Sequence, residues 1–201
     1  MMLYTLQSIF VIFSWNIGYG FACQKILGVP RNNHGIKPIL LVDEETEITK
    51  GKLIAIVPVL SPEWSVAFNI RLTQAAGSVH RNIFRMAEID ENGFTHGTRI
   101  PAVFILKDTS DLSIYSPVND DPHKSFKIPN LLMNQTYHVL IQQRYVSGGD
   151  YKFSIIFDGV EVFSQINTSA RQFYNVKVYN SDLWYQAAFG YISKFELTNF
   201  L

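Results

Sequence analysis

Apolar and polar residues alternate along most of the chain after residue 50. In the segment 63–72, every second residue from Trp64 to Ile70 is apolar, and the segment 135–146 repeats the same period of two. Successive side chains of a strand point to opposite faces, so this alternation indicates strands with one buried and one solvated side. No segment shows a convincing helical period of about 3.6 residues. We therefore expect an all-β protein.

Turn signals separate these segments about every ten residues. Asp158-Gly159 stands between two alternating runs and predicts a tight hairpin, because a type I′ turn needs positive φ at both central residues. A second hairpin is expected across 108–110, and Pro58 indicates that its strand either lies at a sheet edge or ends its pairing there. Regular short strands of this kind favour an antiparallel β-sandwich or barrel. The expected strands are 38–42, 52–60, 63–72, 80–89, 100–108, 111–118, 135–146, 151–157, 160–166, 173–179 and 190–200.

Charge and composition narrow the class of partner. The 17 Lys and Arg balance the 17 Asp and Glu, and a chain without a basic excess is a poor candidate for binding nucleic acid. The 15 Phe, 10 Tyr and 3 Trp suit pleated, half-buried surfaces and support the β prediction. The five histidines show no metal-ligand spacing, and we find no nucleophile elbow, zincin motif or phosphate loop.

The N-terminal 22 residues carry no charge and hold an apolar run. This pattern predicts a secretory signal peptide cleaved near Ala22, although a buried strand or a membrane anchor are alternative interpretations. Asn16 and the glycines interrupt the run before it reaches the length of a stable membrane span. We therefore expect a secreted, extracellular protein with an N-terminal segment, 23–50, packing on a sandwich formed by 51–201.

Two short motifs fit secretion. Asn134 and Asn167 each begin an N-x-[ST] sequon and are candidate glycosylation sites. Cys23 is the only cysteine, so the chain has no internal disulfide. Cys23 either lies at the cleavage point without a role or links two chains.

The order of motifs resembles that of concanavalin A-like, laminin G-like jelly rolls. The resemblance runs through "GTRIPAVFILKDTSDLSIYS", "YHVLIQQRYV", "YKFSIIFDGVEVFS" and the closing "NVKVYNSDLWYQAAFGYISKFELTNF", and covers roughly residues 50–200. It implies two curved antiparallel sheets packed face to face. In lectin and glucanase members of this group the concave sheet forms the sugar cleft, whereas many laminin G modules bind partners through a calcium ion and rim loops.

"AEIDENG" (87–93) resembles the catalytic strand of laminarinase-type glycosidases, which carry Glu-x-Asp-x-Glu. Glu88 and Asp90 match, but a glycosidase needs a second carboxylic acid to protonate the leaving oxygen, and the third position is Asn92. Glu91 would point to the opposite face of a regular strand. Asn92-Gly93 is also a turn dipeptide. We therefore predict that this segment ends a strand and that the chain is not an enzyme.

Calcium is the cofactor that the loops and the resemblance suggest. Asp90 and Asn92 in one loop and Asp120 in another offer hard oxygen ligands of the kind calcium prefers. The alternative is that these residues are solvated turn formers.

Sugar-binding sites combine aromatic rings with a few polar groups. Trp184 and Tyr185 in a predicted loop, with Arg144 and His138 on a long strand, are the candidate contacts. Trp184 could instead close one end of the core. The function predicted is a secreted, non-catalytic module that recognises extracellular glycans or glycoproteins. A matrix protein that uses the sandwich for protein–protein contacts is an alternative, and a glycoside hydrolase is a second.

Overall fold

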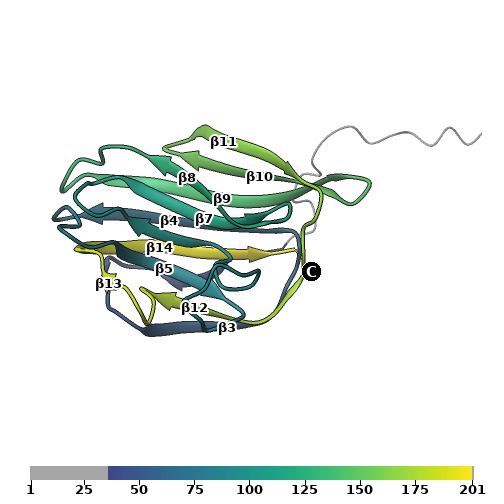
Figure 1. The fold of residues 1–201 in the computed structure, drawn as a ribbon, viewed down its shortest axis with the longest axis horizontal. Coiled ribbons are helices and arrows are strands. Elements are labelled where there is room, and N and C mark those ends of the chain that lie inside the picture. Colours follow the sequence, from purple (N-terminus) through teal and green to yellow (C-terminus); the bar gives the residue numbers. More distant parts are fainter. Residues whose placement is uncertain (1–35, 201) are drawn as a thin grey trace, which may run out of the picture.

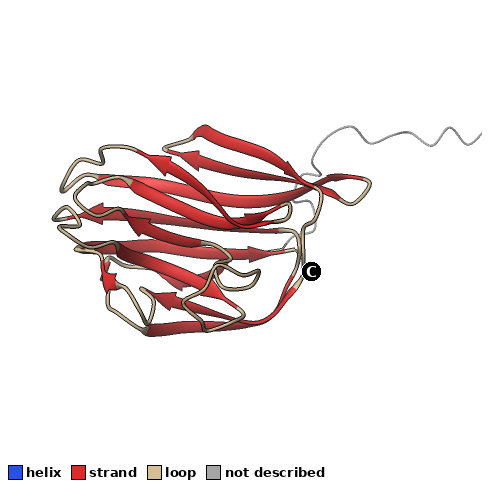
Figure 2. Cartoon of the chain, viewed as in Figure 1, coloured by secondary structure: helices blue, strands red, loops and turns tan. Residues whose placement is uncertain are grey.

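The structure is a computed structural model that describes residues 36–200. Within these residues the chain forms 14 strands and no helix, arranged as two layers (Figures 1 and 2). No helix that is long and apolar enough to cross a membrane occurs in this part of the chain. The predicted signal peptide (1–22) and Cys23 lie outside the described residues.

Each layer is one seven-stranded sheet, and adjacent strands are antiparallel except where a two-residue strand joins sheet B. Sheet A has the order β1 (Ile39–Val42), β14 (Gly190–Asn199), β4 (Trp64–Leu72), β9 (Thr136–Ser147), β10 (Asp150–Phe157) and β11 (Val160–Asn167), and β2 (Thr46–Glu47) pairs with β14. Sheet B has the order β3 (Lys52–Leu60), β12 (Phe173–Asn180), β5 (Arg81–Ala87), β6 (Ala102–Ile105), β7 (Leu112–Val118) and β8 (Asp121–Ile128), and β13 (Gln186–Ala187) pairs with β5.

The hydrophobic core fills the space between the two sheets. On β4 the side chains from Trp64 to Leu72 alternate between buried and partly exposed, as the sequence pattern predicts. Phe68 is fully buried and meets the rings of Phe84 and Phe195 at centroid distances of 4.9 and 6.0 Å. Each such ring contributes about 1.5–3 kcal/mol through burial, so this cluster holds the sheets face to face.

The structure confirms an antiparallel β-sandwich. Asp158 and Gly159 both have positive φ, 47° and 82°, in the predicted hairpin between β10 and β11. β3, which contains Pro58, is an edge strand, and the strand that precedes "DENG" ends at Ala87. β8 was not predicted, because Pro122 and its charged neighbours resemble a loop.

The outer face of sheet B differs from that of sheet A. Almost every residue of β5 and β6 is buried, so both faces of these central strands are covered. Two segments contact these strands from outside: the segment 88–101, which joins β5 to β6 and bonds Arg85, and the segment 181–185, which precedes β13 and packs on Phe104 and Arg85. We call them loop 88–101 and loop 181–185. Together they shape the outer face on which the candidate site lies.

Candidate functional site

A pocket of about 150 Å³ opens on the outer face of sheet B. We call it the Arg99 pocket. A wider groove of about 470 Å³ adjoins it, shares His80 and Tyr185 with it, and includes Trp184. The residues that line the Arg99 pocket are His80, Phe94, Arg99, Phe104, Leu106, Tyr115, His123 and Tyr185.

Arg99 is the charged centre of this pocket. The residue is only 6% exposed, and its side chain lies among four aromatic rings. The guanidinium carbon lies 4.9 Å from the ring centre of Phe94, 5.2 Å from those of Phe104 and Tyr115, and 6.0 Å from that of Tyr185. No carboxylate of residues 36–200 forms an ion pair with it. The buried Asp182 attracts Arg99 without forming an ion pair with it. A buried cation that lacks a directly bonded counter-ion is costly, so the pocket favours an incoming anion.

His123 is the polar partner of Arg99. The guanidinium nitrogen Nη1 lies 3.0 Å from Nε2 and 3.3 Å from Nδ1 of the imidazole, which stacks on the ring of Tyr115. Burial, together with the positive charge of Arg99, lowers the pKa of His123 from 6.5 to about 4. At neutral pH the imidazole is therefore uncharged, and one of its nitrogens accepts a hydrogen bond from Arg99.

Arg85 supports the pocket from β5. Its Nε donates to the carbonyl of Thr98 at 2.6 Å, and its Nη2 donates to the carbonyls of Ile89 and Glu91 at 2.9 and 2.8 Å. The guanidinium carbon also lies 4.4 Å from the ring centre of Trp184. One side chain therefore joins loop 88–101 to loop 181–185.

Asp182 shapes the second loop. Its carboxylate oxygen Oδ1 accepts the backbone N–H groups of Trp184 at 3.1 Å and Tyr185 at 2.7 Å. Burial raises the pKa of Asp182, while these two hydrogen bonds oppose the shift. The tight turn that results places both aromatic side chains beside the groove.

The sequence-predicted ligand residues separate into two groups. Trp184 and Tyr185 line the groove, whereas Arg144 and His138 lie on β9 in the other sheet. Nε of Arg144 donates to Glu63 at 2.9 Å, and His138 is exposed. The structure therefore does not bring Arg144 or His138 to the Arg99 pocket.

The Glu88-x-Asp90 pattern has a structural role. Glu88 accepts the backbone N–H of Tyr174 at 2.8 Å. Asp90 pairs with Lys177 and accepts the hydroxyl of Tyr179 at 3.1 Å. Both carboxylates bind loop 88–101 to β12, so they do not form the pair of opposed carboxylates that a glycosidase requires.

The three predicted calcium ligands are not gathered into an evident site. The carboxylate of Asp90 is neutralised by Lys177, and Asn92 and Asp120 are exposed on their separate loops. Residues 36–200 contain no group of three or more His, Cys, Asp or Glu side chains that could hold a metal ion. Calcium binding at these residues stays a prediction without support from the geometry.

The two sequons lie in different environments. Asn134 is exposed in a turn, with a φ of 62°, and remains a candidate for glycosylation. Asn167 is 2% exposed. Its Nδ2 donates to Gln143 at 2.7 Å, and its Oδ1 accepts the backbone N–H of Asn119. A glycan on Nδ2 is incompatible with this packing, so the prediction for Asn167 conflicts with the folded structure.

Sequence reasoning missed Arg99, His123 and Tyr115. They come from three segments whose proximity only the folded sheet reveals. The available signal was the arginine in "GTRIPAVF", which stands directly before an apolar strand that proves to be buried on both faces.

Comparisons with known proteins find structural likeness without sequence relatives. No family model and no curated protein matches the chain. A heptameric SAP-like pentraxin from Limulus polyphemus is similar, with 14% identity over 87% of this chain and 76% of that one, at a TM-score of 0.49. The alginate lyase Aly36B with an alginate trisaccharide has 13% identity, coverage of 87% and 98%, and a TM-score of 0.48. Domain 4 of an extracellular GH43 arabinanase from Geobacillus stearothermophilus with arabinotriose has 15% identity, covers 86% of this chain and 80% of that one, and has a TM-score of 0.49.

These similarities concern the fold and overturn one prediction. The prediction that the chain is not an enzyme is wrong, because the similar structures include alginate lyases and a fungal glucuronan lyase. The prediction rested on the missing acid at Asn92, which bears only on glycosidase chemistry. The pentraxin and the arabinotriose-bound domain resemble this chain in fold, and the expected glycan partner stays a prediction.

Proposed function

We propose that this chain, a concanavalin A-like jelly roll, binds acidic glycans in the Arg99 pocket and the groove beside it. The observation that carries the proposal is a buried guanidinium that forms no ion pair with a carboxylate of the described residues. A carboxylate or sulfate group on a sugar would provide the missing charge, and arginine presents a planar fork of donors suited to such groups.

The surroundings of Arg99 also suit a sugar. Tyr185 offers an aromatic ring to the apolar side of a pyranose, whereas the ring of Tyr115 stacks on His123. Each of the two tyrosines carries a hydroxyl for a polar contact. The groove continues past His80 to Trp184, so the ligand would be an oligosaccharide segment rather than a single sugar. If the predicted signal peptide directs secretion, this glycan is extracellular.

Calorimetric titration with acidic and neutral oligosaccharides tests the proposal. We expect polyuronates or sulfated glycans to bind and neutral glucans not to bind. Arg99→Met should weaken binding about 10- to 100-fold, the equivalent of losing a charge-assisted hydrogen-bonded pair. Arg144→Met is the matched control, because Arg144 is a partly buried arginine on the opposite sheet.

Two results would contradict this function. One is equal binding of neutral and acidic glycans, which would show that Arg99 does not select charge. The other is an equal loss of affinity in Arg99→Met and Arg144→Met, which would place the site elsewhere. A chain that binds no glycan and self-associates would favour the matrix role.

Cleavage of a uronate polysaccharide by β-elimination is a second candidate. The specific observation is an uncharged His123 beside Arg99 and Tyr115 in one pocket. In this reaction a cation holds the uronate carboxylate, a base removes the proton from C5, the C4–O bond breaks, and the leaving oxygen takes a proton. Arg99 would hold the carboxylate, and His123 and Tyr115 would transfer the protons. Ultraviolet absorbance of the unsaturated product, lost in His123→Gln, is the test.

A further inference from the structure

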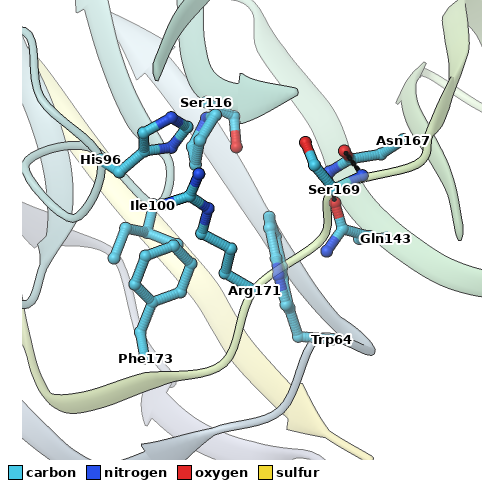
Figure 3. Close-up of a pocket in the computed structure, with 10 residues that line it drawn as sticks. Trp64, His96, Ile100, Ser116, Gln143, Asn167, Ser169, Arg171 and Phe173 are labelled. Carbon is cyan, nitrogen blue, oxygen red and sulfur yellow. Dashed lines mark hydrogen bonds between the residues drawn. The ribbon is translucent and has the colours of Figure 1, made fainter. Parts of the chain in front are cut away.

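A second, much smaller cavity lies on the other side of loop 88–101, between the two sheets (Figure 3). It is largely enclosed and has a volume of about 10 Å³. Its walls come from β4, β7 and β9, from loop 88–101, and from the segment 167–173 that leads into β12. The residues that line it are Trp64, His96, Ile100, Ser116, Pro117, Gln143, Asn167, Ser169, Arg171 and Phe173.

Three buried polar atoms among these residues have no hydrogen-bond partner in the described part of the chain. They are Nδ1 of His96 and the hydroxyl oxygens of Ser116 and Ser169. Ser116 is only 2% exposed. A buried polar group without a partner costs about 1–3 kcal/mol, so three in one cavity indicate a shared partner that is not a protein side chain.

The hydrogen-bond donors and acceptors around the cavity restrict the kind of partner that can bind there. Nδ1 of His96 is buried and has no partner among residues 36–200. It can donate or accept, depending on which ring nitrogen carries the proton. The hydroxyls of Ser116 and Ser169 can donate or accept, and the Arg171 guanidinium at the same cavity can only donate. A partner that can both donate and accept therefore fits all of these groups.

We infer that this cavity is a binding site for one ordered water molecule, which bonds Nδ1 of His96 and the hydroxyls of Ser116 and Ser169. The volume corresponds to about one water-sized probe, and buried waters typically make about three hydrogen bonds. A cavity of about 10 Å³ has room for one water molecule but not for a polyatomic anion such as sulfate. The volume therefore selects water.

This water would support the Arg99 pocket from below. His96 lies between Phe94 and Arg99 on loop 88–101, and Ser116 follows Tyr115 on β7, where successive side chains point to opposite faces. The same two segments thus form the glycan pocket on the outside and the water site on the inside. The inference does not depend on the proposed function, because it concerns only the packing between the sheets.

The sign of a stability change tests the inference. If water satisfies the hydroxyl, Ser116→Ala should lower the melting temperature by about 2–4 °C, the shift expected for one lost hydrogen bond in a domain of this size. If the cavity is dry, the same substitution removes an unsatisfied group and the melting temperature should rise or stay unchanged. Ser125→Ala, at an exposed position of the neighbouring strand, is the control and should have no effect.

Magnetic relaxation dispersion of water oxygen-17 gives a second, direct measurement. We expect a long-lived water in the parent protein that exchanges faster in Ser116→Ala, because it keeps one hydrogen bond fewer, and Ser169→Ala is the substitute variant if Ser116→Ala does not fold. An unchanged residence time would overturn the inference. A bromide ion found in the cavity by anomalous diffraction would also overturn it, because the site would then belong to an anion.

Discussion

Replacing Arg85 with methionine should destabilise the fold and weaken glycan binding together. The three carbonyls that Arg85 bonds belong to loop 88–101, and the ring that it contacts belongs to loop 181–185. The carbonyl of Thr98 is buried, so losing its charged donor costs about 2 kcal/mol, whereas water can reach the other two carbonyls and replace much of their loss. When the lost contact to the Trp184 ring is added, we expect Arg85→Met to lower the free energy of unfolding by about 3 kcal/mol in total.

Urea denaturation of Arg85→Met, Arg85→Lys and Arg81→Met would measure this effect. Arg81 is a matched control on the same strand, since it bonds the carbonyls of Ala76 and Ala187 and lies over a phenyl ring but does not contact loop 88–101. We expect about 1 kcal/mol for Arg81→Met, because its side chain is partly exposed. Lysine cannot reproduce the fork of Arg85, so Arg85→Lys should recover only part of the loss. A change in Arg85→Met no larger than in Arg81→Met would refute the reasoning.

Three further predictions concern stability. Between pH 6.5 and 4 the unfolded state binds more protons than the folded state at His123, because its folded pKa is about 4. Stability should therefore fall as pH falls, by about 1–2 kcal/mol after allowance for solvent screening, and this part of the slope should vanish in His123→Gln thermal melts. Gly190→Ala places a Cβ 2.3 Å from the carbonyl oxygen of Arg71 at a φ of 155°, so a loss of at least about 2 kcal/mol in denaturation is expected. Phe68→Ala removes a ring from the central cluster and should cost about 3–5 kcal/mol, and a loss below 1 kcal/mol would contradict that packing.

The strands of sheet A are readable from sequence because each has one buried and one solvated face. β4 and β9 show this in their alternating burial. β8 escapes the same reasoning, since an edge strand keeps charged residues such as Lys124 and Lys127 to discourage pairing with other chains. The register and order of strands depend on contacts between distant residues, which a local period cannot reveal.

Only part of the candidate site could be predicted from the sequence. Trp184 and Tyr185 stood out as aromatic residues in a loop of polar neighbours. Arg99 carried no such contrast, because its role depends on rings that loop 88–101, β6 and β7 bring together in space. Arg144 looked equally suitable, but its partner Glu63 is 81 residues away in the chain and could not be assigned from sequence.

The burial of Asn167 means that glycan attachment at this residue depends on when the chain folds. In the folded domain its amide is held by Gln143, so an oligosaccharide could be attached only before that contact forms. Attachment and folding would then compete, and a chain that receives the sugar first could not complete this corner of the sandwich. If the chain meets the glycosylation machinery, the fraction of molecules modified at Asn167 would report how fast the chain folds relative to glycan attachment, and fast-folding molecules would carry no glycan there.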